Sequence, residues 1–207
     1  MKYPNFVEEK KLWEKGYKYV VGLDEAGRGP LAGPVVAGAV IIKSKIAIKN
    51  SEVFSIVDDS KKLTPEQREK VYNFFKKNSN IEWGIGIVSE KVIDRINILE
   101  ATKLAMVKAV KNIKADFLII DGNIKLNINL PQKSIIKADQ KVFSCALASI
   151  FAKVTRDRLM QKYHKKYLQY GFDKHKGYGT AYHFKMLKKH GPCKIHRKSF
   201  YPVSSFA

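Results

Sequence analysis

The stretch VVGLDEAGRGPLAGPVVAGAVII, residues 20–42, constrains the fold more than any other part of the sequence. Two runs of strand-forming residues flank a segment rich in glycine and proline, which predicts two strands joined by a tight connection. The adjacent acids Asp24 and Glu25 lie where the first strand ends. Ligands of open α/β sheets bind at the carboxyl ends of strands. The stretch therefore predicts a sheet with acidic functional groups at one of its edges.

Segments with strand signals and helix signals follow along the chain. Strand-like composition recurs at residues 81–88, 115–122 and 133–139, and helical signals cover residues 65–77, 97–113, 140–168 and 181–189. The apolar run within 115–122 is typical of a strand buried on both faces. With 207 residues, the chain is long enough for one main domain with a sizeable core. The pattern predicts an α/β fold with a mixed five-stranded sheet flanked by helices.

Two of these helices have recognisable starts. Thr64, Pro65 and Gln67 have the spacing of a capping box with proline at the first helical position. Asn97 is followed by Glu100 three residues later, which is the same kind of start signal. We therefore expect helices to begin at residues 65 and 97.

The chain is strongly basic, and the excess is concentrated towards its C-terminus. It has 39 Lys and Arg against 19 Asp and Glu, a net charge of +20. From residue 151 onward there are 14 basic residues and two acids, with tyrosines and phenylalanines between them. Because phosphates bind cations and bases stack on flat rings, this composition favours nucleic-acid binding. Solvated basic helix faces are the alternative reading.

The sequence indicates no membrane segment and no export signal. Its apolar runs stay well short of the roughly 18 residues that a membrane helix needs. The start, MKYPNFVEEKKLWEKGYK, lacks the continuous apolar region of a secretory signal. Cys145 and Cys193 do not suggest a disulfide framework. A cytoplasmic protein is expected.

Acids that follow predicted strands form a candidate metal site. Asp24 and Glu25 close the first strand, Asp121 closes the buried strand FLIID, and Asp139 begins the long helix. Converging carboxylates repel one another unless a cation lies between them. Oxygen ligands favour Mg²⁺ or Mn²⁺ over zinc. The spacing alone leaves this site open, because strand-end acids are also common in turns.

Each acid has a structural alternative. Asp24 could form an Asx-turn, Asp121 precedes glycine in a common turn dipeptide, and Asp139 could cap its helix. Asp157, in the motif TRDR, lies five helical turns from Asp139 and so on the same helix face. An ion pair with one of its adjacent arginines is the favoured interpretation for Asp157.

The loop GRGPLAG admits two interpretations. Gly27, Gly29 and Ala32 fit a loose dinucleotide-binding fingerprint, but that motif should open a helix, and residues 34–42 read as a strand. Bare backbone that approaches a sugar-phosphate chain, with Arg28 positioned between two glycines, is the favoured interpretation.

His190, Cys193 and His196 have a spacing that could begin a zinc site. A fourth ligand is not evident in the sequence. Ordinary surface histidines near the turn at Gly191 are the favoured interpretation.

Several motifs together resemble one known family. GLDEAGRGPLAGPVVAGAV, DSKKL, NILEATKLAM, IIDGN, KADQK, ASIFAKVTRDRLM, HKGYGT and IHRKSF resemble the bacterial ribonuclease HII signature over nearly the whole chain. The GRG after the acids separates the sequence from the related ribonuclease HIII group. The resemblance implies an RNase H-like catalytic domain at residues 1–168, with a basic, helical, substrate-binding section at residues 169–207 packed on it.

The resemblance also implies an activity. The implied activity is that of an endonuclease that hydrolyses the RNA strand of RNA/DNA hybrids and cuts 5′ of single ribonucleotides in duplex DNA. Two divalent ions, Mg²⁺ or Mn²⁺, would serve the reaction, which leaves 5′-phosphate and 3′-hydroxyl ends. The implied partners are these nucleic acids. A clamp-binding motif like that of some relatives is not visible, so no protein partner is predicted.

Motif by motif, the resemblance assigns site residues. The family's four catalytic, metal-binding acids correspond to Asp24, Glu25, Asp121 and Asp139. The residues that read the 2′-hydroxyl and the backbone correspond to Gly27, Arg28 and Gly29, the junction-sensing tyrosine to Tyr178, and the phosphate-binding lysine to Lys61. Without that motif context, Tyr178 is another aromatic on a basic surface and Lys61 a solvated loop lysine.

The sequence departs from the family pattern at one place. Where relatives have small residues before ASI, it reads FSCAL, so Cys145 and Leu147 leave the helix packing near Asp139 less certain. Two other functions stay open on the residues alone. They are a non-catalytic hybrid-binding protein, which would need no metal, and a metal-dependent nuclease of the same fold that cuts DNA.

Overall fold

A five-stranded sheet forms the centre of the protein. The computed structural model describes residues 4–43, 57 and 63–206. Across the sheet the strand order is β3-β2-β1-β4-β5. The bounds are β1 Val20–Ala26, β2 Val35–Ile42, β3 Ile81–Val88, β4 Phe117–Asp121 and β5 Gln132–Ile135. β1, β2 and β3 pair antiparallel, and β4 and β5 continue the sheet parallel to β1. The predicted mixed five-stranded sheet is confirmed.

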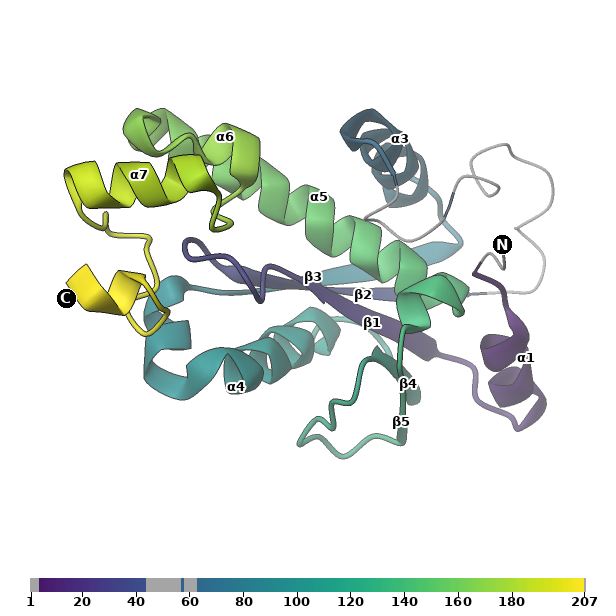
Figure 1. The fold of residues 1–207 in the computed structure, drawn as a ribbon. Helices are drawn as coiled ribbons and strands as arrows, with labels where there is room; N and C mark the ends of the chain where they lie inside the picture. Colours follow the sequence, from purple (N-terminus) through teal and green to yellow (C-terminus); the bar gives the residue numbers. More distant parts are fainter. Residues whose placement is uncertain (1–3, 44–56, 58–62, 207) are drawn as a thin grey trace.

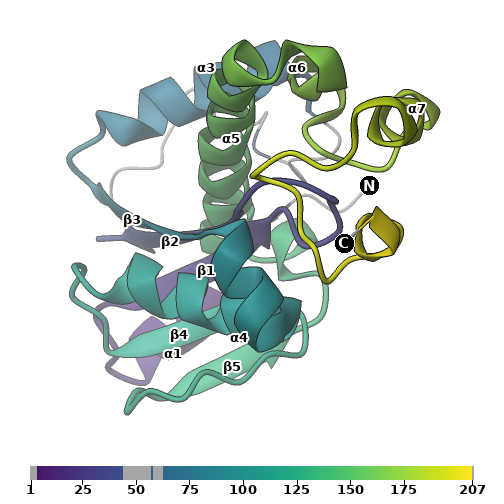
Figure 2. The same cartoon turned by 90° about the vertical axis from the view of Figure 1, so that its left-hand side faces the viewer.

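Helices cover both faces of this sheet. Their bounds are α1 Val7–Glu14, α3 Pro65–Lys76, α4 Glu90–Val110, α5 Phe143–Lys166, α6 Phe172–His175 and α7 Ala181–His190. Helices α3 and α5 lie on one face and α4 on the other (Figures 1 and 2). Each face encloses a separate apolar core, with Met106 from α4 in one and Phe151 from α5 in the other. The predicted flanking helices are confirmed.

Helix starts follow the sequence signals in part. The capping box is present, because Gln67 N–H donates to Thr64 Oγ1 and Thr64 N–H donates to Gln67 Oε1. α4 begins seven residues before Asn97, at Glu90, so the expected start was wrong. Asn97 is nevertheless a break in this helix, with φ +66°, and its side chain accepts from the N–H groups of Leu99 and Glu100. The cap signal is real, but it starts only the second half of α4.

Helix α5 approaches the sheet closely because glycines lie beneath it. A Cβ on Gly22 of β1 would lie 2.4 Å from the backbone carbon of Ser144, and one on Gly38 of β2 would lie 2.3 Å from the carbonyl oxygen of Ala148. Cys145 and Leu147 are fully buried in the same stretch. The larger FSCAL residues are therefore accommodated within the packing of α5.

The C-terminal section packs beyond the end of the sheet. It contains α6, α7 and the 3-10 helices η2 Leu168–Tyr170 and η3 Val203–Phe206 (Figure 1). Phe172 and Leu187 of this section share a core with Leu31 and Met160. A domain boundary at residue 168 stays a prediction. Among the described residues, no helix is both long and apolar enough to cross a membrane.

Candidate active site

Two predicted acids meet because their strands are neighbours. β1 and β4 pair in parallel, with Leu23 opposite Ile120, so the next residues along the two strands are Asp24 and Asp121. Asp24 is almost wholly buried, and Asp121 is partly exposed. Parallel pairing thus brings two carboxylates to the same edge of the sheet.

A third acid joins them from the segment before α5. Asp139 lies in the 3-10 helix η1, Ala138–Gln140, and is buried. Asp121 Oδ1 accepts a hydrogen bond of 2.5 Å from the Ala138 N–H, which fixes this helix against β4. One carboxylate oxygen each from Asp24, Asp121 and Asp139 lie within 4.8 Å of one another. The structure thus brings together three of the four acids that the resemblance assigns to the site.

The electrostatics of this group favour a cation. Burial, followed by the charges of Glu25 and Asp121, raises the pKa of Asp24 well above its ordinary value. Hydrogen bonds from Ser149 and from the Glu25 N–H oppose that shift. A divalent cation among these oxygens would offset the repulsion, and an all-oxygen donor set suits Mg²⁺ or Mn²⁺. The residues present therefore fit such an ion.

Glu25 lies beside this group rather than within it. Its carboxylate is 3.6 Å from Arg28 Nη1, and the arginine side chain is about half exposed, at 45%. Glu25 is still close enough for its charge to raise the pKa of Asp24. The Glu25–Arg28 pair connects the acids to the glycine loop.

The glycine loop is held by Arg197, whose guanidinium is fully buried. Its Nε, Nη1 and Nη2 donate to the carbonyls of Gly33, Arg28 and Gly27 at 3.0, 2.8 and 2.5 Å. Burial and the charge of Arg156 lower the pKa of Arg197. Guanidinium groups nevertheless stay charged in proteins, and here carbonyl oxygens take the place of a carboxylate partner. The conformation of the loop is thereby fixed from within.

Arg156 of α5 holds the same loop from the other side. It is 1% exposed and donates to the carbonyls of Pro34, Ala32 and Lys176 at 3.0, 3.1 and 3.0 Å. Gly27 has φ +99°, and a Cβ there would lie 2.1 Å from Arg156 Nε. Only glycine fits this position without displacing the arginine.

Tyr178, to which the resemblance assigns junction sensing, lies against the glycine loop. Its side chain is 45% exposed, and its ring carbon Cε1 would be 3.8 Å from a Cβ on Gly29. The Arg156 guanidinium lies 6.0 Å from the ring centroid. The Leu31 N–H donates to the Gly177 carbonyl at 2.8 Å, which ties the two segments together. The structure therefore brings Arg28, Gly29 and Tyr178 into one exposed surface, with the buried Gly27 immediately before Arg28.

The buried arginines are the site residues that sequence reasoning missed. Both belong to the basic C-terminal third of the chain, where each was counted as a surface cation. TRDR and IHRKSF were the available signals, because both stretches belong to the quoted motifs. A sequence does not reveal that backbone carbonyls surround a guanidinium.

Three other predictions from the sequence concern Asp157, the group of histidines with Cys193, and Lys61. Asp157 pairs with Lys153 at 2.7 Å rather than with an adjacent arginine, and it does not join the acidic group. No zinc-type group forms among His190, Cys193 and His196 in the described part of the chain. Lys61 lies outside the described residues.

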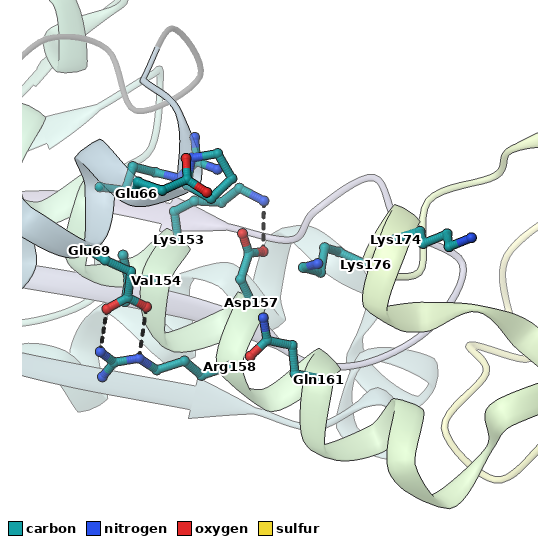
Figure 3. A pocket seen from close by; sticks show the side chains of 11 residues that line it. Glu66, Glu69, Lys153, Val154, Asp157, Arg158, Gln161, Lys174 and Lys176 are labelled. Atoms are coloured by element: carbon teal, nitrogen blue, oxygen red, sulfur yellow. Dashed lines mark hydrogen bonds and ion pairs between the residues drawn. The ribbon is translucent and has the colours of Figure 1, made fainter.

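A groove of about 550 Å³ opens between α3, α5 and α6 (Figure 3). Its wall combines residues of α3, α5 and α6 with Lys176 just after α6, and the lining includes Glu69, Lys153, Asp157, Arg158 and Lys174. Lys153–Asp157 and Arg158–Glu69 are ion pairs across its wall. Lys174 has no ion-pair partner among the residues that the structure describes. Lys176 also lines the groove, and its carbonyl accepts from Arg156, whose guanidinium lies 6.0 Å from the Tyr178 ring centroid.

Comparisons with known proteins agree with this arrangement. The family model described as Ribonuclease HII matches residues 21–203. A curated ribonuclease HII of Chlamydia trachomatis serovar L2 is 52% identical over 203 residues, which cover 95% of this chain and 90% of that one. Another, of Acetivibrio thermocellus, is 53% identical over 94% of this chain and 74% of its own. The crystal structure of ribonuclease H2 from Pyrococcus horikoshii matches with a TM-score of 0.73 at 30% identity, covering 91% of this chain and 96% of that one.

Proposed function

Because this chain belongs to the ribonuclease HII family of nucleases, we propose that it hydrolyses the RNA strand of RNA/DNA hybrids and also cuts 5′ of single ribonucleotides within duplex DNA. One observation carries this proposal. The carboxylates of Asp24, Asp121 and Asp139 converge within 4.8 Å. Through Glu25 and Arg28 they adjoin a loop of bare backbone and an exposed tyrosine. Acids for phosphate chemistry and a surface for sugar recognition therefore lie side by side.

The acids are the proposed catalytic and metal-binding residues. Two divalent ions, Mg²⁺ or Mn²⁺, held by Asp24, Glu25, Asp121 and Asp139 would activate water and stabilise the leaving 3′ oxygen. Asp121 also has a structural role. Its Oδ1 accepts a hydrogen bond from the Ala138 N–H and so orients the 3-10 helix that carries Asp139. The products would carry 5′-phosphate and 3′-hydroxyl ends.

Discrimination of RNA from DNA requires contact with the 2′-hydroxyl. We assign this contact to backbone groups of Gly27 and Gly29, with Arg28 near the scissile phosphate. Arg156 and Arg197 hold this loop rigid by occupying its carbonyls, so that its N–H groups are preorganised for the substrate. Tyr178 would stack on the deoxyribose that follows the ribonucleotide.

The rest of the duplex is expected to follow the basic surface. A net charge of +20 provides attraction for phosphates over much of the molecule. Lys174 in the groove and Lys61, which the resemblance assigns to phosphate binding, are candidates for contacts away from the cut. Cys145 and Cys193 are both free thiols, as expected of a protein that functions in a reducing cytoplasm.

The test uses a DNA duplex with one ribonucleotide and a label at one end of that strand. We expect a single cut 5′ of the ribonucleotide in Mg²⁺ or Mn²⁺, no cut in EDTA, and an intact all-DNA control. A uniform RNA/DNA hybrid should also be cut.

Other outcomes would contradict the proposal in different ways. Tight binding without cleavage in either metal would indicate a hybrid-binding protein. Cleavage of the all-DNA control would indicate a nuclease that does not read the 2′-hydroxyl. Unchanged cleavage in EDTA would remove the role given to the acids.

A further inference from the structure

Three histidines of the C-terminal section lie together behind Tyr178. The rings of His183 and His196 are joined by a hydrogen bond of 3.0 Å between their Nε2 atoms. His183 Nδ1 lies 2.9 Å from the Tyr178 carbonyl oxygen, and the Cys193 N–H donates to His196 Nδ1 at 2.9 Å. His175 stacks on His183 with ring centroids 4.5 Å apart. His196 and His183 therefore form one continuous chain of hydrogen bonds from the Cys193 N–H to the Tyr178 carbonyl.

The partners at the two ends of this chain determine where the protons lie. A carbonyl only accepts, so His183 carries its proton on Nδ1 and leaves Nε2 as an acceptor. A backbone N–H only donates, so His196 must accept at Nδ1 and carry its proton on Nε2. These two requirements agree, because His196 Nε2 then donates to His183 Nε2. The chain is complete only when both rings are neutral.

The surroundings keep the rings neutral. His183 and His196 are almost fully buried, and burial lowers the pKa of each to about 4. His175 adds to this effect on both rings, and its own pKa is lowered by burial. The other titratable groups packed here are Tyr170, Asp173, Lys176, His190 and Cys193. Neutral imidazoles at pH 7 follow from this environment.

The same stretch of chain also holds the glycine loop. Arg197, the residue after His196, binds the carbonyls of Gly27 and Arg28. Two adjacent residues therefore hold the two parts of the proposed recognition surface. Arg197 binds the glycine loop, and His196 binds Tyr178 through His183. One half is the backbone that would read the 2′-hydroxyl, and the other is the ring that would read the next sugar.

We propose that His183 and His196 are positioning residues that orient Tyr178 against the glycine loop and thereby set the preference for cutting at RNA-to-DNA junctions. This inference rests on the proposed function. Neither histidine touches the acids or the expected path of the substrate, and each acts only through the carbonyl of Tyr178. If that hydrogen bond is lost, the tyrosine backbone is released and the stacking position of its ring becomes less defined.

The first test reads the protons directly and needs no activity. Multiple-bond ¹H–¹⁵N correlation spectra of the ring nitrogens at pH 7 should show His183 protonated on Nδ1 and His196 on Nε2. The opposite tautomer on either ring, or a doubly protonated ring at pH 7, would overturn the inference.

The second test compares two substitutions at one position. Asn places an amide N–H where His183 has Nδ1, so His183→Asn keeps a donor for Tyr178, whereas His183→Gln places its amide where Nε2 was and loses that donor. On a duplex strand with four consecutive ribonucleotides, the ratio of junction cuts to internal cuts should fall about tenfold for His183→Gln and stay within about threefold for His183→Asn. His190→Gln, on the same helix but exposed, is the control and should leave the ratio unchanged.

The ratio is measured within one substrate, so a smaller amount of folded enzyme does not move it. Tyr178→Ala should lower the ratio, and adding His183→Gln to Tyr178→Ala should lower it no further. A further fall in the double variant, or an unchanged ratio in His183→Gln, would overturn this inference alone. A wild-type protein that cuts no ribonucleotide-containing strand would overturn the proposed function and this inference with it.

Discussion

At the scale of single residues, Gly29 allows folding and recognition to be separated. Its φ is not in the left-handed region, and a Cβ there would meet only Tyr178 Cε1, at 3.8 Å, which is ordinary contact. Gly29→Ala should therefore fold normally, with the free energy of unfolding within about 0.5 kcal/mol of wild type. If bare backbone must approach the 2′-hydroxyl, kcat/KM on a single-ribonucleotide duplex should fall at least about tenfold. Thermal unfolding and initial rates check the two parts, and an unchanged kcat/KM would remove Gly29 from the recognition surface.

Single residues also show what a sequence can predict about a site. Asp24, Asp121 and Asp139 could be grouped beforehand as candidates, because two lie near the carboxyl ends of predicted strands, one precedes a predicted helix, and parallel strands end at one edge. The structure extends β1 two residues beyond Asp24, to Ala26. Glu25 was assigned to the same site, and its carboxylate lies beside the three acids, 3.6 Å from Arg28 Nη1, so its share in holding an ion stays a proposal. The partners of His183, the Tyr178 carbonyl and the His196 ring, were not predicted, because the backbone turns that bring these groups together leave no periodic signal in the sequence.

At the scale of elements, the glycines beneath α5 determine how the acids meet. Gly22→Ala would place a Cβ 2.4 Å from the backbone of Ser144, so α5 would have to move away from β1. We expect a loss of about 2 kcal/mol or more, seen as a melting temperature lower by about 4–8 °C, together with reduced cleavage because Asp139 precedes α5. Gly16→Ala is the matched control. Its φ of +95° is strained for alanine, but nothing lies within 4 Å, so only about 1 kcal/mol and no specific loss of cleavage are expected. Equal effects of the two changes would contradict this account.

The elements themselves were predictable where local signals were strong. The capping box before α3 and the apolar run of β4 act over a few residues, and both appear as expected. Helix α1 was missed because its helical pattern is weak: only Leu12 and Glu9 are buried, and Glu9 is held by the distant Ser144. The first half of α4 was missed because Asn97 has the signature of a helix start. Tertiary contacts decide such segments, and local propensity does not.

At the scale of the whole molecule, the excess of positive charge should govern affinity more than the active site does. With 39 basic residues against 19 acids, much of the binding free energy for a duplex is expected from released counterions. Asp121→Asn keeps an oxygen for the Ala138 N–H but removes one of the converging charges. This variant should therefore fold, lose cleavage, and bind an RNA/DNA hybrid within about tenfold of wild type measured in EDTA.

The salt dependence of duplex binding by Asp121→Asn separates the electrostatic contribution of the basic surface from the contribution of the active site. Hybrid affinity, measured by fluorescence anisotropy, should fall at least about tenfold between 50 and 200 mM salt, with a linear plot of log K against log salt. An all-DNA duplex should give nearly the same slope, because phosphate contacts carry no sequence or sugar information. Equal slopes would show that the electrostatic part of binding is the same for both duplexes, so that the wild-type enzyme distinguishes them by cleavage. A slope near zero would show instead that the basic surface does not face the duplex, and wild-type cleavage by Asp121→Asn would rule out a catalytic role for that acid.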